Sequence, residues 1–92
     1  MREKRVLEEA GRPATSVKHQ ILAVDDEISN IKVIRELFSG PEYEIIPAYN
    51  GAQALLELQK HKELSLVLLD LMLPDTSGLE VCQKIRREHS LL

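Results

Sequence analysis

Three short apolar stretches, each followed by a stretch with helical spacing, constrain the fold more than any other feature of this sequence. The apolar stretches are residues 20–24, 43–49 and 64–70, and helices are expected at 28–38, at 52–62 and from Gly78 onward. Strands that alternate with helices of about 10–15 residues are typical of βαβ units with parallel strands. The sequence therefore predicts an α/β fold with a parallel sheet.

The same stretches predict the order of the strands. ILAV and LVLL, in the first and third stretches, show no polar alternation, which indicates strands that are covered on both faces. Pro47 cannot donate a hydrogen bond to a neighbouring strand, so we place the second strand at an edge. The predicted spatial order is 2-1-3, and right-handed crossovers place the first helix on one face of the sheet and the second helix on the other.

The expected boundaries and helix faces follow from local pattern. Gly11 and Pro13 interrupt any helical pattern near the start, so residues 1–18 are interpreted as a leader or linker and residues 19–92 as the folded domain. In the first helix, apolar residues at spacings of three and four predict one buried face. The residues expected on that face are Ile28, Ile31, Ile34, Leu37 and Phe38.

Composition supports one small globular domain and argues against several classes of protein. The chain has 92 residues, of which 43% are hydrophobic. No apolar run approaches the roughly 20 residues of a membrane-spanning helix, and the first ten residues are too charged for a signal peptide. Cys82 is the single cysteine, and a net charge of −3 provides no basic surface for nucleic acid. We expect a cytoplasmic protein in which this segment contacts neither nucleic acid nor membrane.

Acidic residues follow two of the predicted strands at the point where each ends. Asp25 and Asp26 follow the first strand, and Asp70 directly follows the LVLL run of the third. In an open sheet of order 2-1-3 the winding reverses between strands 1 and 3, and ligands bind there beyond the carboxyl ends. We therefore expect the three carboxylates to share one pocket.

Three carboxylates in one pocket repel one another, by roughly 3 kcal/mol for a pair about 5 Å apart at an effective dielectric near 20. A hard divalent cation such as Mg²⁺ removes this penalty and also binds phosphate oxygens. A carboxylate beside such a cation can attack phosphorus. The residues thus predict a Mg²⁺-dependent phosphoryl site. Taken alone, Asp25-Asp26-Glu27 more often favours a helix N-terminus, and Asp75 is interpreted as the cap of a turn or helix.

The stretches ILAVDDE, AYNGAQALLEL and LLDLMLPDTSGLEVCQKIR resemble the receiver domain of bacterial two-component response regulators, over about residues 19–92. The resemblance implies a flavodoxin-like doubly wound sheet, of which this sequence holds three βα units and lacks the last two strands and helices. It implies that Asp70 is the phosphoacceptor. It also implies that Mg²⁺ is held by Asp25, Asp26, Asp70 and the backbone carbonyl of Met72, with no catalytic residue beyond Asp70.

By the same resemblance the partner is a histidine kinase or phosphotransfer protein, and the chain is a phosphoacceptor module rather than an enzyme. The family also uses a Ser or Thr after strand 4 and a Lys after strand 5, and neither Ser90 nor any Lys here stands in those positions. An alternative is therefore a truncated receiver that is never phosphorylated and acts only as an interaction module. A phosphohydrolase is disfavoured, because Met72 stands where such enzymes place a second acid.

The third strand gives one further expectation about partners. It is apolar on both faces, and the sequence contains no fourth strand to pair with its open side. An open, flat, apolar edge is a template for pairing with another chain. We expect self-association through this edge.

Overall fold

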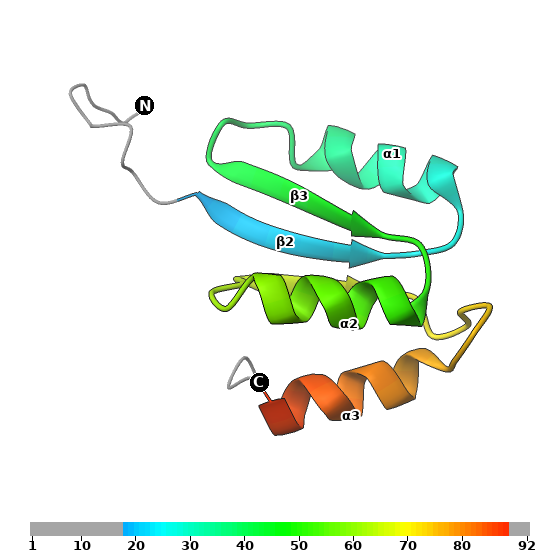
Figure 1. The fold of residues 1–92 in the computed structure, drawn as a ribbon. Coiled ribbons are helices and arrows are strands. Elements are labelled where there is room, and N and C mark those ends of the chain that lie inside the picture. Colours follow the sequence, from blue (N-terminus) through cyan, green and yellow to red (C-terminus); the bar gives the residue numbers. More distant parts are fainter. Residues whose placement is uncertain (1–17, 89–92) are drawn as a thin grey trace.

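The computed structural model describes residues 18–88, which form a parallel sheet with helices on both faces (Figure 1). Along the chain the elements are β2 (His19–Val24), α1 (Ile28–Leu37), β3 (Tyr43–Ala48), α2 (Gly51–Lys60), β4 (Leu66–Leu69) and α3 (Gly78–Glu88). The predicted α/β class and the alternation of strands and helices are confirmed. Except for Lys18, the predicted leader lies outside the described residues, as do residues 89–92.

The sheet has three strands in the order β3-β2-β4, with both neighbours parallel to β2. In this register Leu22 lies beside Ile46 of β3 on one side and beside Val67 of β4 on the other. The predicted order 2-1-3 is confirmed. Pro47 stands in β3, the edge strand, where its missing N–H costs no hydrogen bond on the outer side.

The helices divide between the two faces as the crossover rule predicts. Helix α1 packs on β2 and β3 from one face, whereas α2 and α3 lie together on the other (Figure 1). Within residues 18–88, no helix has the length and apolar character needed to cross a bilayer.

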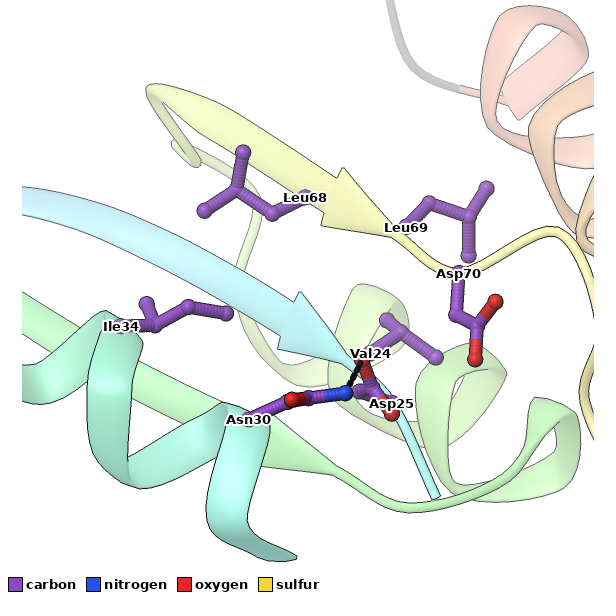
Figure 2. Close-up of a pocket in the computed structure, with 7 residues that line it drawn as sticks. All are labelled: Val24, Asp25, Asn30, Ile34, Leu68, Leu69 and Asp70. Atoms are coloured by element: carbon purple, nitrogen blue, oxygen red, sulfur yellow. Dashed lines mark hydrogen bonds between the residues drawn. The ribbon is translucent and has the colours of Figure 1, made fainter. Parts of the chain in front are cut away.

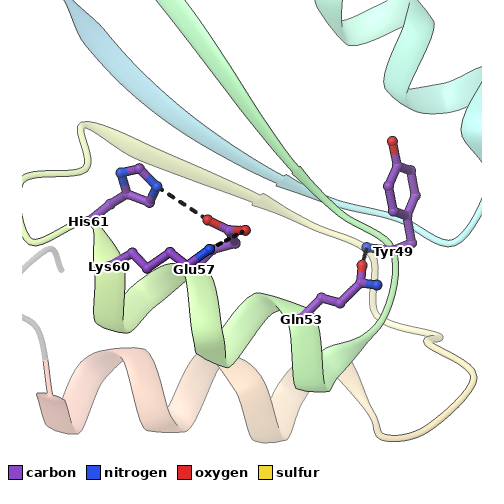
Figure 3. A network of polar contacts seen from close by, with 5 residues as sticks. All are labelled: Tyr49, Gln53, Glu57, Lys60 and His61. Carbon is purple, nitrogen blue, oxygen red and sulfur yellow. Dashed lines mark hydrogen bonds and ion pairs between the residues drawn. The ribbon is translucent and has the colours of Figure 1, made fainter.

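Helix α2 is held at both ends by side chains (Figure 3). The Asn50 side chain accepts a hydrogen bond from the backbone N–H of Gln53 (2.8 Å), and the Gln53 side chain accepts one from the N–H of Tyr49 (2.7 Å). These bonds satisfy N–H groups that have no partner inside the helix. At the other end, Nε2 of His61 lies 3.2 Å from a carboxylate oxygen of Glu57. Side chains from the local sequence therefore support both ends of α2.

The main core lies between the sheet and the α2–α3 layer. Its buried residues come from β2, β3, both helices and the segment before β4: Leu22, Val24, Ile46, Ala48, Ala54, Leu58, Leu64, Val81 and Ile85. Burial of an aliphatic side chain of this size contributes about 1.5–3 kcal/mol. This core holds the carboxyl ends of β2 and β4 at a fixed separation.

The predicted apolar face of α1 is only partly correct. Ile31 is buried, but Ile28 and Leu37 are 62% and 73% exposed. Residues spaced by three drift about 60° per step around a helix of 3.6 residues per turn, so the two ends of this series point to opposite sides. The sheet covers only the middle of the series.

Candidate functional site

The three predicted site carboxylates meet at the carboxyl edge of the sheet. The backbone N–H of Asp25 donates to the carbonyl of Ala48 (3.0 Å), and that of Asp70 donates to the carbonyl of Val24 (2.9 Å). The sheet bonding therefore extends one residue beyond β2 and β4 and fixes the start of both loops. One carboxylate oxygen each from Asp25, Asp26 and Asp70 lies within 4.8 Å of the others.

Local hydrogen bonds orient two of the three carboxylates. Oδ1 of Asp25 accepts from the backbone N–H of Glu27 (2.9 Å), and its Oδ2 accepts from the side-chain amide of Asn30 (3.0 Å; Figure 2). Oδ1 of Asp70 accepts from the backbone N–H of Met72 (3.0 Å). Each carboxylate oxygen has two lone pairs, so these bonds leave acceptor capacity for a cation.

Beside the carboxylates an open cleft of about 420 Å³ runs between α1 and the sheet (Figure 2). Asp25 and Asp70 stand at one end, and apolar side chains, among them Ile34 and Leu68, line the other. Asp25 and Asp70 are half-buried and Asp26 is exposed. Met72 is 83% exposed, and neither Met72 nor Asp26 lines the cleft.

The donor set suits a hard cation. Every side-chain donor is a carboxylate oxygen, and carboxylate oxygens with water are the ligands that Mg²⁺ prefers. At separations up to 4.8 Å, each pair of carboxylate charges repels by roughly 3 kcal/mol at an effective dielectric near 20. A divalent cation bound between the carboxylates makes the electrostatic energy of the cluster favourable. Because Asp26 is exposed, water can reach the site.

The loop between β4 and α3 contains a contact that the sequence did not predict in full. Asp75, interpreted as a cap, does cap a helix, but the helix is α2 rather than its neighbour α3. Its Oδ1 accepts from the N–H of Gly51 (2.8 Å), and its Oδ2 accepts from the N–H of Ala52 (3.0 Å). The bond from Gly51 lowers the pKa of Asp75, the bond from Ala52 acts in the same direction, and desolvation partly opposes them.

Asn30 is a second residue that sequence reasoning missed. It orients Asp25 from the first turn of α1, five residues along the chain. A polar amide among the isoleucines of that helix, one turn after the acidic pair, was the available signal. Asn50-Gly51 is a dipeptide typical of turns, and here the N–H of Gly51 also donates to the Asp75 carboxylate.

A sequence model of the response regulator receiver domain matches residues 21–92. The chain belongs to the response regulator receiver family. Among curated relatives, the probable transcriptional regulator ycf27 of Pyropia yezoensis is 44% identical over 71 residues. The match covers 77% of this receiver chain and 29% of the length of the relative.

Solved structures of receivers share the fold. The response regulator TrrA from Thermotoga maritima, in complex with Mg²⁺-BeF, is 38% identical and superposes with a TM-score of 0.71, over 78% of this chain and 62% of that one. TrrA in complex with the histidine kinase ThkA gives the same identity and TM-score, over 78% of this chain and 61% of that one. The flavodoxin-like arrangement predicted from the sequence is therefore confirmed for the three βα units of residues 18–88.

Proposed function

We propose that this receiver accepts a phosphoryl group on Asp70 from a histidine kinase or phosphotransfer protein, with Mg²⁺ held by Asp25, Asp26, Asp70 and the backbone carbonyl of Met72. The observation that carries the proposal is the meeting of three carboxylates, from the ends of two neighbouring strands, within 4.8 Å. Two properties of TrrA support it: that relative forms a complex with Mg²⁺-BeF and another with a histidine kinase.

The hydrogen bonds around Asp70 suggest which oxygen reacts. Oδ1 accepts the N–H of Met72, so Oδ2 is the freer nucleophile. Oδ2 forms a bond to phosphorus while the N–P bond of the donor phosphohistidine breaks, and the imidazole leaves with the electron pair. Bound Mg²⁺ supplies neutralisation of the charge on the phosphoryl oxygens. Asn30 contributes by keeping the Asp25 carboxylate turned toward the site.

The proposal covers acceptance of the phosphoryl group and not catalytic turnover, since the product is an aspartyl phosphate on the chain itself. The partner is a protein that carries phosphohistidine, and this segment contacts neither nucleic acid nor membrane. We place the reaction in the cytoplasm, a reducing compartment that suits a chain with the single Cys82.

Labelling with radioactive acetyl phosphate in the presence of Mg²⁺ tests the proposal. We expect one label per chain that resists acid better than phosphohistidine does and is released by hydroxylamine or base. Asp70→Asn abolishes the label because the nucleophile is gone, whereas Asp75→Asn retains it at saturating Mg²⁺. A chelator prevents labelling of the parent.

Two outcomes contradict the proposal. Undiminished labelling of Asp70→Asn places the phosphoacceptor on another residue. A parent chain that stays unlabelled by both acetyl phosphate and phosphorylated kinase, although it binds Mg²⁺, supports the alternative of an interaction module that is never phosphorylated.

A further inference from the structure

The loop between β4 and α3 carries two of the four ligand groups of the proposed Mg²⁺ site, the carboxylate of Asp70 and the carbonyl of Met72. The loop is closed on itself at its base, where the N–H of Gly78 donates to the carbonyl of Leu71 (2.8 Å) and Met72 forms an isolated bridge with Ser77. These bonds fix the internal shape of the loop. The start of the loop is tied to β2 by the bond from the N–H of Asp70 to the carbonyl of Val24 (2.9 Å), but this bond does not reach Met72, two residues further on.

Asp75 supplies a connection between this loop and the rest of the domain. Both of its carboxylate oxygens accept backbone N–H groups from the first turn of α2, one from Gly51 (2.8 Å) and one from Ala52 (3.0 Å). Figure 1 shows the yellow-orange loop beside the end of α2 where that helix begins. The first N–H groups of a helix carry positive partial charge, so an anionic side chain is a favourable partner for them.

The packing around Gly51 shows that the loop fits closely on α2. A Cβ at this position would collide with the Cγ2 methyl group of Thr76 and would lie 3.2 Å from Oδ1 of Asp75. The backbone of Gly51 is buried, so the loop side chains occupy the space that a side chain there would fill. Hydrogen bonding and steric fit therefore place the loop on α2 independently.

We propose that Asp75 is a positioning residue for the Mg²⁺ site, because its contact with α2 holds the part of the loop beyond Asp70, which presents the Met72 carbonyl, against the body of the domain. This inference rests on the proposed function and deepens it. It assigns to Asp75 no contact with the cation. Residues that orient metal ligands typically change metal affinity about 10–100-fold when they are removed.

The test compares Mg²⁺ binding by the full chain with that of two variants, measured by amide NMR titration with Mg²⁺ alone. Asp75→Ala releases the loop from α2, and we expect its Kd for Mg²⁺ to rise about tenfold. Asn50→Ala is the matched control, because the Asn50 side chain caps the same helix end through the N–H of Gln53 and not through a bond to the loop. Its Kd is expected to stay within about twofold of the parent value, although both variants lower the unfolding midpoint.

A second variant approaches the same contact from the other side. Gly51→Ala places a methyl group against Thr76 and Asp75, so it is expected to weaken Mg²⁺ binding and to speed exchange of the Met72 amide in the absence of Mg²⁺. An alanine in a helix is otherwise stabilising relative to glycine, so a loss of Mg²⁺ affinity has no explanation in helix propensity. The double variant Gly51→Ala with Asp75→Ala is expected to have a Kd for Mg²⁺ little higher than that of either single variant.

The outcomes separate this inference from the function on which it rests. If the parent binds Mg²⁺ and Asp75→Ala binds it equally well, or if Asp75→Ala and Asn50→Ala raise the Kd alike, the positioning role is wrong and the metal site stands. If neither the parent nor any variant binds Mg²⁺, the metal site itself is wrong and the positioning role is overturned with it.

Discussion

Residues 21–24 of β2 pair in parallel with residues 66–69 of β4, and both segments are aliphatic, yet they are covered to different extents. Residues 21–24 of β2 are at most 2% exposed. In β4, Leu66 is 41% exposed and the three residues after it are half-buried. The two strands differ in their neighbours, since β2 has a partner on each side and, within residues 18–88, β4 has one only on the side of β2.

The register shows which part of β4 lacks cover. Val67 and Leu69 lie beside Leu22 and Val24 and pack against the same core beneath α2 and α3. Leu68 points to the other side and lines the cleft beside α1. Within residues 18–88, helix α1 packs on β2 and β3, and the cleft beside it leaves Leu68 of β4 accessible on this face. An apolar strand thus shows which side chains favour burial, but the neighbouring elements decide which are buried.

The largest expected effect tests this comparison directly. Leu22→Ala removes a fully buried side chain from β2 and is expected to lower the free energy of unfolding by about 2–5 kcal/mol. Leu66→Ala makes the same chemical change in β4, where the residue is 41% exposed, and is expected to cost below about 1 kcal/mol. Urea unfolding of the two variants measures both values. Equal losses would show that β4 is covered in solution.

Much of this architecture follows from sequence because the signals are local or pairwise. Pro47 indicates that the second strand lies at an edge of the sheet. The apolar runs ILAV and LVLL indicate that the first and third strands are interior, so the predicted strand order is 2-1-3. Once that order is fixed, Asp70 and the pair Asp25-Asp26 must meet, because parallel strands bring their carboxyl ends to one edge of the sheet. The fold and the meeting of the three carboxylates were therefore predictable.

The contacts that orient the site were not predictable in the same way. The bond between Asp75 and Gly51 joins residues 24 apart, and nothing in either local sequence selects the other. The cap preference of Asp75 indicated a helix N-terminus, but only the packing of two loops decides which one. The exposure of Ile28 and Leu37 has a similar origin, because it depends on how far the sheet extends beneath α1.

A smaller effect is expected at the outer edge of β4. The full chain is expected to self-associate through this edge, and Leu68→Lys adds a charge that must be desolvated when two edges pair. Loss of one buried aliphatic contact is worth about 1.5–3 kcal/mol, so the dissociation constant should rise at least about tenfold. Light scattering over a range of protein concentrations measures the change. Leu56→Lys is the matched control, because Leu56 is 58% exposed on α2, a helix that packs on β2 and β3.

A monomeric parent at all concentrations, with slow amide exchange in β4, would contradict the expected association. Equal weakening by Leu68→Lys and Leu56→Lys would place the contact elsewhere. The β3 edge of the sheet is expected to pair with another chain less readily than the β4 edge. Pro47 interrupts the outer row of hydrogen-bonding groups of β3, because it has no N–H to donate.

The smallest expected effect is the dependence of the β4 exit on pH. Backbone bonds that do not titrate hold the first residue after each strand, Asp25 to Ala48 and Asp70 to Val24. The loop that continues from β4 is held to α2 by the carboxylate of Asp75. The hydrogen bond from Gly51 lowers the pKa of Asp75 below its ordinary value of 3.8, so this contact contributes stability above pH 3.8 and loses it as the pH falls through the folded-state pKa.

Asp75→Asn removes the titrating group. The difference in unfolding free energy between parent and variant should therefore be constant near neutral pH and should shrink progressively below pH 3.8. The change is expected to be modest because the carboxylate is exposed and solvent screens it. Urea unfolding of both proteins from neutral to acid pH measures it, and corrected amide protection at Asp70 should fall with acid in the parent before protection in β2 does. A difference that stays flat across the acid range would show that the charge of Asp75 is irrelevant to how the loop is held, and that hydrogen-bond geometry and the fit against Gly51 hold it instead.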